Sequence, residues 1–197
     1  MTPAIVLAAG ASTRMGRPKA LLRAGDRTFI RMILDALRDG GVPGAVVVVR
    51  PGQDEVMAAV AASAFGRAVP NPRPDEGQLS SLIAGLNAID RPGVDAALVT
   101  LVDVPLIEAS AVRRLLARAA VSDAPILRAV HRGRHGHPVI FKRAVFERLR
   151  QADPSIGAKA VVRAARVEDV EVDAPGIVED VDTPEDYARL FPIEPAP

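Results

Sequence analysis

The stretch Ile5–Leu22 constrains the fold of this 197-residue chain more than any other. It begins with the apolar run Ile5–Ala9, which is typical of a buried strand, and breaks at Gly10 into a loop of small residues. Arg14 and Lys19 follow the loop at fixed offsets. Glycine and alanine let oriented backbone amides approach phosphate oxygens, and two cations neutralise the charge that remains. The stretch therefore predicts a phosphate-binding loop after the first strand.

Two commoner phosphate-binding motifs do not fit this loop. A Walker motif needs a hydroxyl residue after its lysine, whereas Ala20 follows Lys19. A dinucleotide-binding fingerprint needs a second glycine, and Ser12 stands at that place. The next predicted strand ends in Arg50, so an NADP-linked oxidoreductase with Arg50 at the 2′-phosphate is an alternative interpretation. A tight strand-to-helix turn without any ligand is another.

Apolar runs alternate with helical patterns along most of the chain, which favours an α/β fold. We expect strands at about 4–8, 45–49, 68–69 and 95–102, and helices at about 29–38, 54–65, 78–88 and 109–120. The first strands are apolar throughout, which indicates a sheet covered on both faces. The predicted fold is thus a three-layer, Rossmann-like, mostly parallel sheet with helices on both faces.

The second half of the chain predicts a small hairpin and edge subregion. We expect strands 125–130 and 138–141 to pair as a hairpin around residues 131–137, and strand 167–172 to lie at a sheet edge. Helices are expected at 144–150 and 158–165, and a last one from Pro184, since proline is favoured at the first helical position. Residues 1–191 are expected to form a single domain and residues 192–197 a frayed tail.

Composition excludes several classes of function. The net charge is +1, and aromatic residues are 3% of the chain, so we expect no nucleic-acid partner. There is no cysteine, which rules out disulfides and thiolate chemistry and is compatible with a reducing cytoplasm. No signal peptide is visible, and no apolar run reaches the roughly 18 residues of a membrane span. We therefore expect a cytoplasmic protein without a membrane partner.

Acidic residues in two distant segments are candidate metal ligands. Asp103 directly follows the strand predicted at 95–102, and ligands of open α/β sheets bind beyond the carboxyl ends of strands. Asp180 and Asp182 alternate, so they share one side of an extended segment. Magnesium prefers one or two carboxylates together with phosphate oxygens. Helix capping and turn formation are the alternative roles of these residues, and the pattern does not choose between Asp180 and Asp182.

The first motif resembles the signature L-A-A-G-x-S/T-x-R-M-G-x-x-K of the nucleotidyltransferases of the GT-A-like superfamily. It is most similar to the branch that includes molybdenum cofactor cytidylyltransferase. The residues that match are Leu7, Ala8, Ala9, Gly10, Ser12, Arg14, Met15, Gly16 and Lys19. The resemblance implies that residues 7–12 wrap a nucleoside triphosphate and that Arg14 and Lys19 contact its phosphates.

Three further segments are similar to motifs of the same branch. Asn-Pro at 71–72 followed by G-x-x-S-S-L implies that Asn71, Gly77, Ser80 and Ser81 help to seat a base and ribose, and it favours cytidine. D-x-P at 103–105 and D-x-D-T-P-E-D at 180–186 imply magnesium on Asp103 and on Asp180 or Asp182. G-H-P at 136–138 implies that His137 faces the acceptor, whose phosphate Arg134 is a candidate to bind. His135 stands where that family more often has arginine.

The resemblance and the residues together predict a magnesium-dependent nucleotidyltransferase with Arg14, Lys19 and Asp103 as catalytic residues. We expect it to transfer CMP from CTP to a phosphorylated acceptor such as molybdopterin and to release pyrophosphate. A molybdoenzyme or chaperone is an expected protein partner. The alternatives are transfer to a sugar phosphate or another phosphorylated acceptor, the oxidoreductase named above, and a non-catalytic nucleotide-binding regulator.

Overall fold

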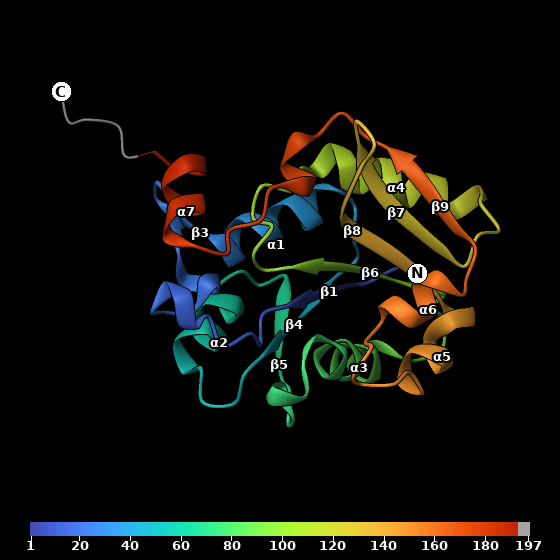
Figure 1. Ribbon diagram of the computed structural model, residues 1–197, viewed down its shortest axis with the longest axis horizontal. Coiled ribbons are helices and arrows are strands. Elements are labelled where there is room, and N and C mark those ends of the chain that lie inside the picture. Colours follow the sequence, from blue (N-terminus) through green and yellow to red (C-terminus); the bar gives the residue numbers. More distant parts are fainter. Residues whose placement is uncertain (193–197) are drawn as a thin grey trace.

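A computed structural model describes residues 1–192 of the chain, which form a seven-stranded sheet with helices on both faces (Figure 1). The strand order is β5-β4-β1-β6-β8-β7-β9. The strands are β1 Ala4–Leu7, β4 Ala45–Val49, β5 Gly66–Pro70, β6 Ala96–Leu101, β7 Ile126–His131, β8 Arg134–Lys142 and β9 Val167–Glu171. Only β8 runs antiparallel to its neighbours, so the predicted mostly parallel α/β fold is confirmed.

The helices divide between the two faces of the sheet. They are α1 Phe29–Asp39, α2 Asp54–Ala61, α3 Gln78–Ile89, α4 Ala109–Val121, α5 Phe146–Arg150, α6 Lys159–Arg163 and α7 Pro184–Leu190. Apolar residues of α1, α2 and α4 join one core cluster, and those of α3, α5 and α6 join the other. Along β4, Val47 and Val49 face the first cluster while Val46 and Val48 face the second. This alternation explains why the strand is apolar at every position.

Several boundaries differ from the prediction. The helix expected to reach residue 65 ends at Ala61, and the next strand begins at Gly66. The hairpin turn is tighter than expected, because β8 already begins at Arg134 and includes His135 and His137. A small hairpin of β2 Arg23–Ala24 and β3 Arg27–Thr28 was not predicted from the sequence. Two-residue strands carry too few side chains to produce a readable alternation.

The end of the described chain returns to the body of the protein. Tyr187 and Phe191 lie against Phe29 of α1, with ring centroids 6.1 and 5.2 Å from that ring. β9 lies at the edge of the sheet, as predicted. Of the predicted frayed tail, residues 193–197 lie outside the described residues. Within residues 1–192, no helix has both the length and the apolar character needed to cross a membrane.

Gly85 sets how closely α3 approaches the sheet. A Cβ at this position would overlap Ile5 Cγ2 and lie 3.2 Å from Val48 Cγ2. Overpacking of this kind costs about 1–3 kcal/mol, which exceeds the roughly 1 kcal/mol that alanine gains over glycine within a helix. We expect Gly85→Ala to destabilise the fold, measured as a lower midpoint of urea unfolding.

Gly44→Ala is the matched control for that variant. Gly44 has no positive φ, and a Cβ there would meet nothing within 4 Å. We expect this substitution to leave the midpoint unchanged or to raise it slightly. A Gly85→Ala protein as stable as Gly44→Ala would contradict the close packing of α3 on β1.

Candidate active site

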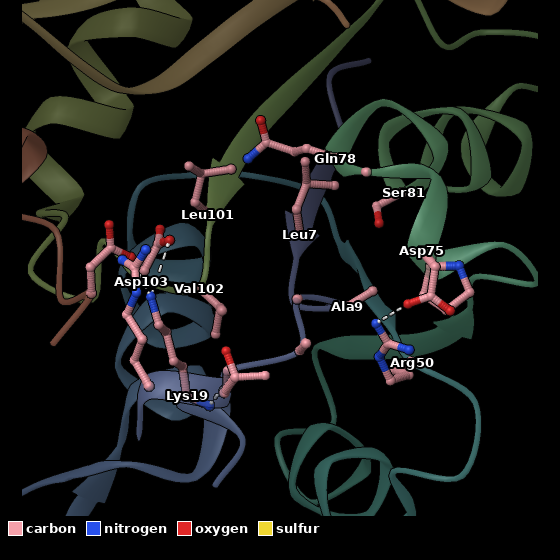
Figure 2. Close-up of a pocket in the computed structure, with 18 residues that line it drawn as sticks. Leu7, Ala9, Lys19, Arg50, Asp75, Gln78, Ser81, Leu101, Val102 and Asp103 are labelled. Atoms are coloured by element: carbon pink, nitrogen blue, oxygen red, sulfur yellow. Dashed lines mark hydrogen bonds and ion pairs between the residues drawn. The ribbon is translucent and has the colours of Figure 1, made fainter. Parts of the chain in front are cut away.

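The carboxyl ends of β1, β4 and β6 open onto one cavity, here named the first cavity, of about 500 Å³. It lies where the parallel strands end, the edge of an open α/β sheet at which ligands bind. Figure 2 shows residues from separate loops around it. Its lining is Leu7, Ala9, Gly10, Ala11, Ser12, Thr13, Arg14, Lys19, Arg50, Pro74, Asp75, Gly77, Gln78, Ser81, Leu101, Val102, Asp103 and Asp182.

The loop after β1 is folded back on itself at Ser12. This residue has φ 50° and ψ 30°, a left-handed backbone conformation that is energetically costly for residues other than glycine. Its hydroxyl oxygen accepts a hydrogen bond of 3.2 Å from the backbone N–H of Lys19. Gly16, with φ 66°, supplies a second left-handed residue. The hydrogen bond between Ser12 and Lys19 therefore closes the loop and places Lys19 at the first cavity. Arg14 also lines this cavity, and its side chain is exposed.

Lys19 lies between two carboxylates that are far apart in the sequence. Its Nζ is 2.5 Å from Asp182 Oδ1 and 3.6 Å from Asp103 Oδ2, and its side chain is only 12% exposed. The backbone N–H of Val181 donates to the carbonyl of Asp103 at 2.8 Å, which joins the last segment to the end of β6. Thr183 and Asp186 then form a reciprocal cap that begins α7. These bonds bring the two acidic motifs to one place.

The surroundings of Asp103 shift the pKa of its carboxyl. Burial raises the pKa of its carboxyl, the Lys19 ammonium opposes that rise, and the carboxylate of Asp182 adds to it. Its Oδ1 is buried and has no hydrogen-bond partner among the residues that the structure describes. An unpaired buried carboxylate oxygen is costly, and a cation would satisfy it.

The structure separates the two alternatives for the second acidic residue. Asp182 lines the first cavity, whereas Asp180 is exposed and is not part of the lining. Within residues 1–192 no group of three or more histidine and acidic side chains is arranged to hold a metal ion. A divalent ion at this place would thus take two protein carboxylates, and the remaining ligands would come from substrate or water, as magnesium favours.

Most residues expected at the loop and the second motif line the first cavity, but three do not. Ala8, Asn71 and Ser80 are buried outside the lining. The side-chain amide of Asn71 donates to the hydroxyls of Ser80 and Ser81, at 2.8 and 3.0 Å. Asn71 and Ser80 therefore shape the wall at the start of α3, and Ser81 forms part of its surface. Direct contact of Asn71 or Ser80 with a ligand stays a prediction.

Arg50, Asp75 and Gln78 line the first cavity without having been predicted as part of it. Arg50 had a usable signal, because it directly follows a parallel strand and so lies at the same sheet edge as Asp103. Asp75 had none, because it lies in a loop whose path the sequence does not fix. Its carboxylate is 2.9 Å from Arg50 Nη2.

A second cavity of about 570 Å³ adjoins the first and shares Leu7, Gln78 and Leu101 with it. It lies between the sheet, α3 and α6. Most of its wall is apolar, and its polar lining includes His137. Burial lowers the pKa of the His137 imidazole, and Nδ1 has no hydrogen-bond partner within residues 1–192.

Arg134, the other residue expected near an acceptor, lies outside both cavities. Its side chain is 65% exposed, and its guanidinium donates to the carbonyl of Val178 at 3.2 Å. His135 lines the second cavity instead and lies 3.1 Å from Arg128 Nη2. A contact of Arg134 with the acceptor stays a prediction.

Comparison with known proteins supplies an independent finding. Residues 4–170 match the model of a family described as the MobA-like NTP transferase domain. The molybdenum cofactor guanylyltransferase of Rhizobium meliloti (strain 1021) is 37% identical over 117 residues, which are 57% of this chain and 50% of that protein. The chain thus aligns with half or less of the length of the curated relatives it matches.

Solved structures resemble the whole chain. The crystal structure of Rv0371c from Mycobacterium tuberculosis H37Rv has a TM-score of 0.82 and 28% identity, and the match covers 97% of this chain and 98% of that one. A second structure of Rv0371c, a complex with manganese, has a TM-score of 0.77 and 28% identity, with 96% and 97% covered.

The environment of Asp103 leads to a prediction about stability. Because the folded pKa exceeds the ordinary carboxyl value, the folded protein holds this proton more tightly than the unfolded chain does. Stability supplied by the protonated form is lost as the pH rises through the folded pKa. We expect Asp103→Asn, which has no such titration, to gain stability relative to the parent as the pH rises above about 4, the ordinary carboxyl value, measured by urea unfolding.

Asp180→Asn is the control, since the exposed side chain of Asp180 lies outside the cavity lining. We expect its stability to stay within about 0.5 kcal/mol of the parent at every pH. A stability difference between Asp103→Asn and the parent that does not change with pH would contradict the raised pKa of Asp103.

Proposed function

The chain belongs to the MobA-like NTP transferase family, and we propose that it transfers a nucleoside monophosphate from a nucleoside triphosphate to a phosphorylated acceptor. The observation that carries this proposal is the position of Lys19 between Asp103 and Asp182, beside the loop that follows β1. A lysine held between two carboxylates, beside a loop of small residues at the same cavity, suits a polyphosphate with its counter-ion. Family membership leaves the oxidoreductase alternative without support.

In the proposed reaction, a phosphate oxygen of the acceptor attacks the α-phosphorus of the triphosphate. A new P–O bond forms, and the bond to the oxygen that bridges the α- and β-phosphates breaks, with its electron pair leaving on pyrophosphate. The acceptor supplies the nucleophile, so the enzyme contributes position and charge. Lys19 and Arg14 neutralise the charge that builds on the departing pyrophosphate, and the amides of residues 10–12 hold the phosphates.

A divalent cation fits the donor set. Asp103 and Asp182 would hold it, and the buried, unpaired Oδ1 of Asp103 supports this assignment. When bound, such an ion draws negative charge away from the reacting phosphate groups. We propose Mg²⁺, which a site of one or two carboxylates and phosphate oxygens suits; the manganese complex of Rv0371c supports a divalent metal in a related fold.

We place the acceptor in the second cavity, because that cavity adjoins the first and its wall is mainly apolar. An acceptor with a large ring system, such as molybdopterin, would pack that ring against the apolar part of the wall. His137 lines this cavity and would contact the acceptor there. The molybdoenzyme or chaperone partner stays a prediction.

Two observations support different bases for the donor nucleotide. The curated relative with 37% identity is a guanylyltransferase, which supports GTP. The segment Asn71–Leu82 resembles the cytidylyl-transferring branch, which supports CTP. The donor is decided by measuring pyrophosphate release with GTP, CTP, ATP and UTP, each with Mg²⁺ or Mn²⁺ and with molybdopterin as acceptor. The proposed reaction would be contradicted if none of the four nucleoside triphosphates released pyrophosphate, either with molybdopterin or with a panel of sugar phosphates as acceptor.

Lys19→Ala tests the role of the central cation. Loss of a donor aimed at developing charge costs about 10²-fold or more in turnover, so we expect at least that decrease in kcat. Arg17→Ala is the matched control, because Arg17 is an exposed cation of the same loop that bonds only the carbonyl of Leu21 within residues 1–192. Equal turnover of the Lys19→Ala and Arg17→Ala proteins would show that the role assigned to Lys19 is wrong.

A further inference from the structure

Arg50 and Asp75 form an ion pair across the mouth of the first cavity, on the side away from Lys19 (Figure 2). Arg50 directly follows β4, and Asp75 lies in the short 3-10 turn Pro74–Glu76 before α3. Arg50 Nη2 is 2.9 Å from Asp75 Oδ1. Both side chains line the cavity, so the pair brings a fork of donors and a carboxylate side by side at its wall.

The Arg50–Asp75 pair is too exposed, and its hydrogen bonding too incomplete, for a pair that serves mainly to stabilise the fold. The side chain of Asp75 is 85% exposed, and exposed pairs contribute about 0–1 kcal/mol or less to stability. Arg50 Nε is buried and has no hydrogen-bond partner within residues 1–192. A buried N–H without a partner is costly, so Arg50 would gain stability by turning this donor toward a ligand that enters the cavity.

The rest of the lining orients the ligand. If the triphosphate lies at Lys19, Asp103 and Asp182, as the proposed function requires, the nucleoside extends past Leu7 and Ala9 toward α3. There the wall consists of Gln78, Ser81 and the Arg50–Asp75 pair. The far end of a nucleotide is its base, whose edge presents carbonyl and ring-nitrogen acceptors next to N–H donors.

From this arrangement we propose that Arg50 and Asp75 determine which base the enzyme accepts. Arg50 donates to acceptors on the base edge, and Asp75 accepts from its N–H groups. The pairing resembles the way arginine and acidic side chains read base edges in nucleic acids. The proposal rests on the proposed function for the orientation of the nucleotide, and it assigns two specificity residues that are not part of the phosphate chemistry.

The test measures binding without acceptor, so no transfer occurs. Dissociation constants for GTP, CTP, ATP and UTP with Mg²⁺ are determined by calorimetry for the parent, Arg50→Met and Asp75→Asn. We expect the parent to prefer one base, and each variant to lose about fivefold or more of that preference, which is the lower end of what one good base contact discriminates. Inorganic triphosphate, which has no base, should bind all three proteins equally.

Arg73→Met and Glu76→Gln are the matched controls. Arg73 and Glu76 form another ion pair of the same segment, with a distance of 3.3 Å, and neither lines the first cavity. We expect both controls to keep the base preference of the parent. The double variant of Arg50 and Asp75 should lose little more than either single variant, because the two side chains act on one base edge.

The outcomes separate this proposal from the one on which it rests. The assignment would be overturned if the parent showed no base preference. It would also be overturned if the variants bound all four nucleotides with the same loss of affinity, because the pair would then be structural or bind the ribose. If inorganic triphosphate does not compete with the nucleotide, the phosphate end is wrongly placed and the proposed function fails, whatever the pair does. A base preference lost only in the Arg50 and Asp75 variants supports the assignment.

Discussion

The ion pairs of Lys19 with Asp182 and Asp103 are the contacts on which the site depends. They link the first loop, the end of β6 and the segment before α7, which are separated by up to 163 positions in the sequence. A buried or half-buried charge is tolerated only when it is paired, so each of these side chains requires the others. The backbone bond from Val181 to Asp103 fixes the distance between the two acidic segments.

The cluster of Lys19, Asp103 and Asp182 has a charge composition that suits the binding and release of ions. Two carboxylates share one ammonium, and one buried carboxylate oxygen has no partner within the described residues. Such a site has one more carboxylate than it has cations, so a divalent cation can complete it, and the bound cation would then attract a polyphosphate. The same arrangement that destabilises the folded chain is the one that the proposed chemistry uses, an exchange of stability for function that is common at active sites.

The two adjoining cavities lie in different parts of the fold, and each suits one of the two proposed substrates. The first is bounded by loops that follow parallel strands and is rich in charge, which suits the donor nucleotide. The second lies over the antiparallel strand β8 and is mainly apolar, which suits an acceptor with a large ring system. They share Leu7, Gln78 and Leu101, so substrates bound in both would approach each other near the end of β1.

The sequence by itself determined the elements that rest on periodicity and on small residues. Nearly continuous apolar runs gave β1, β4 and β6 and the mostly parallel sheet, since a strand buried on both faces has few polar positions. The loop motif located Arg14 and Lys19 after β1, and the end of the apolar run of β6 located Asp103, because positions relative to a strand end follow from local geometry.

Only the tertiary structure decided which residues meet across the cavity. Asp180 and Asp182 share one side of their segment in the sequence pattern, and the fold brings Asp182 alone into the lining, because the bond from Val181 to Asp103 sets how that segment passes β6. Arg50 and Asp75 meet because a loop of irregular path crosses the end of β4. Contacts of this kind depend on loop conformation and packing, and neither leaves a period in the sequence.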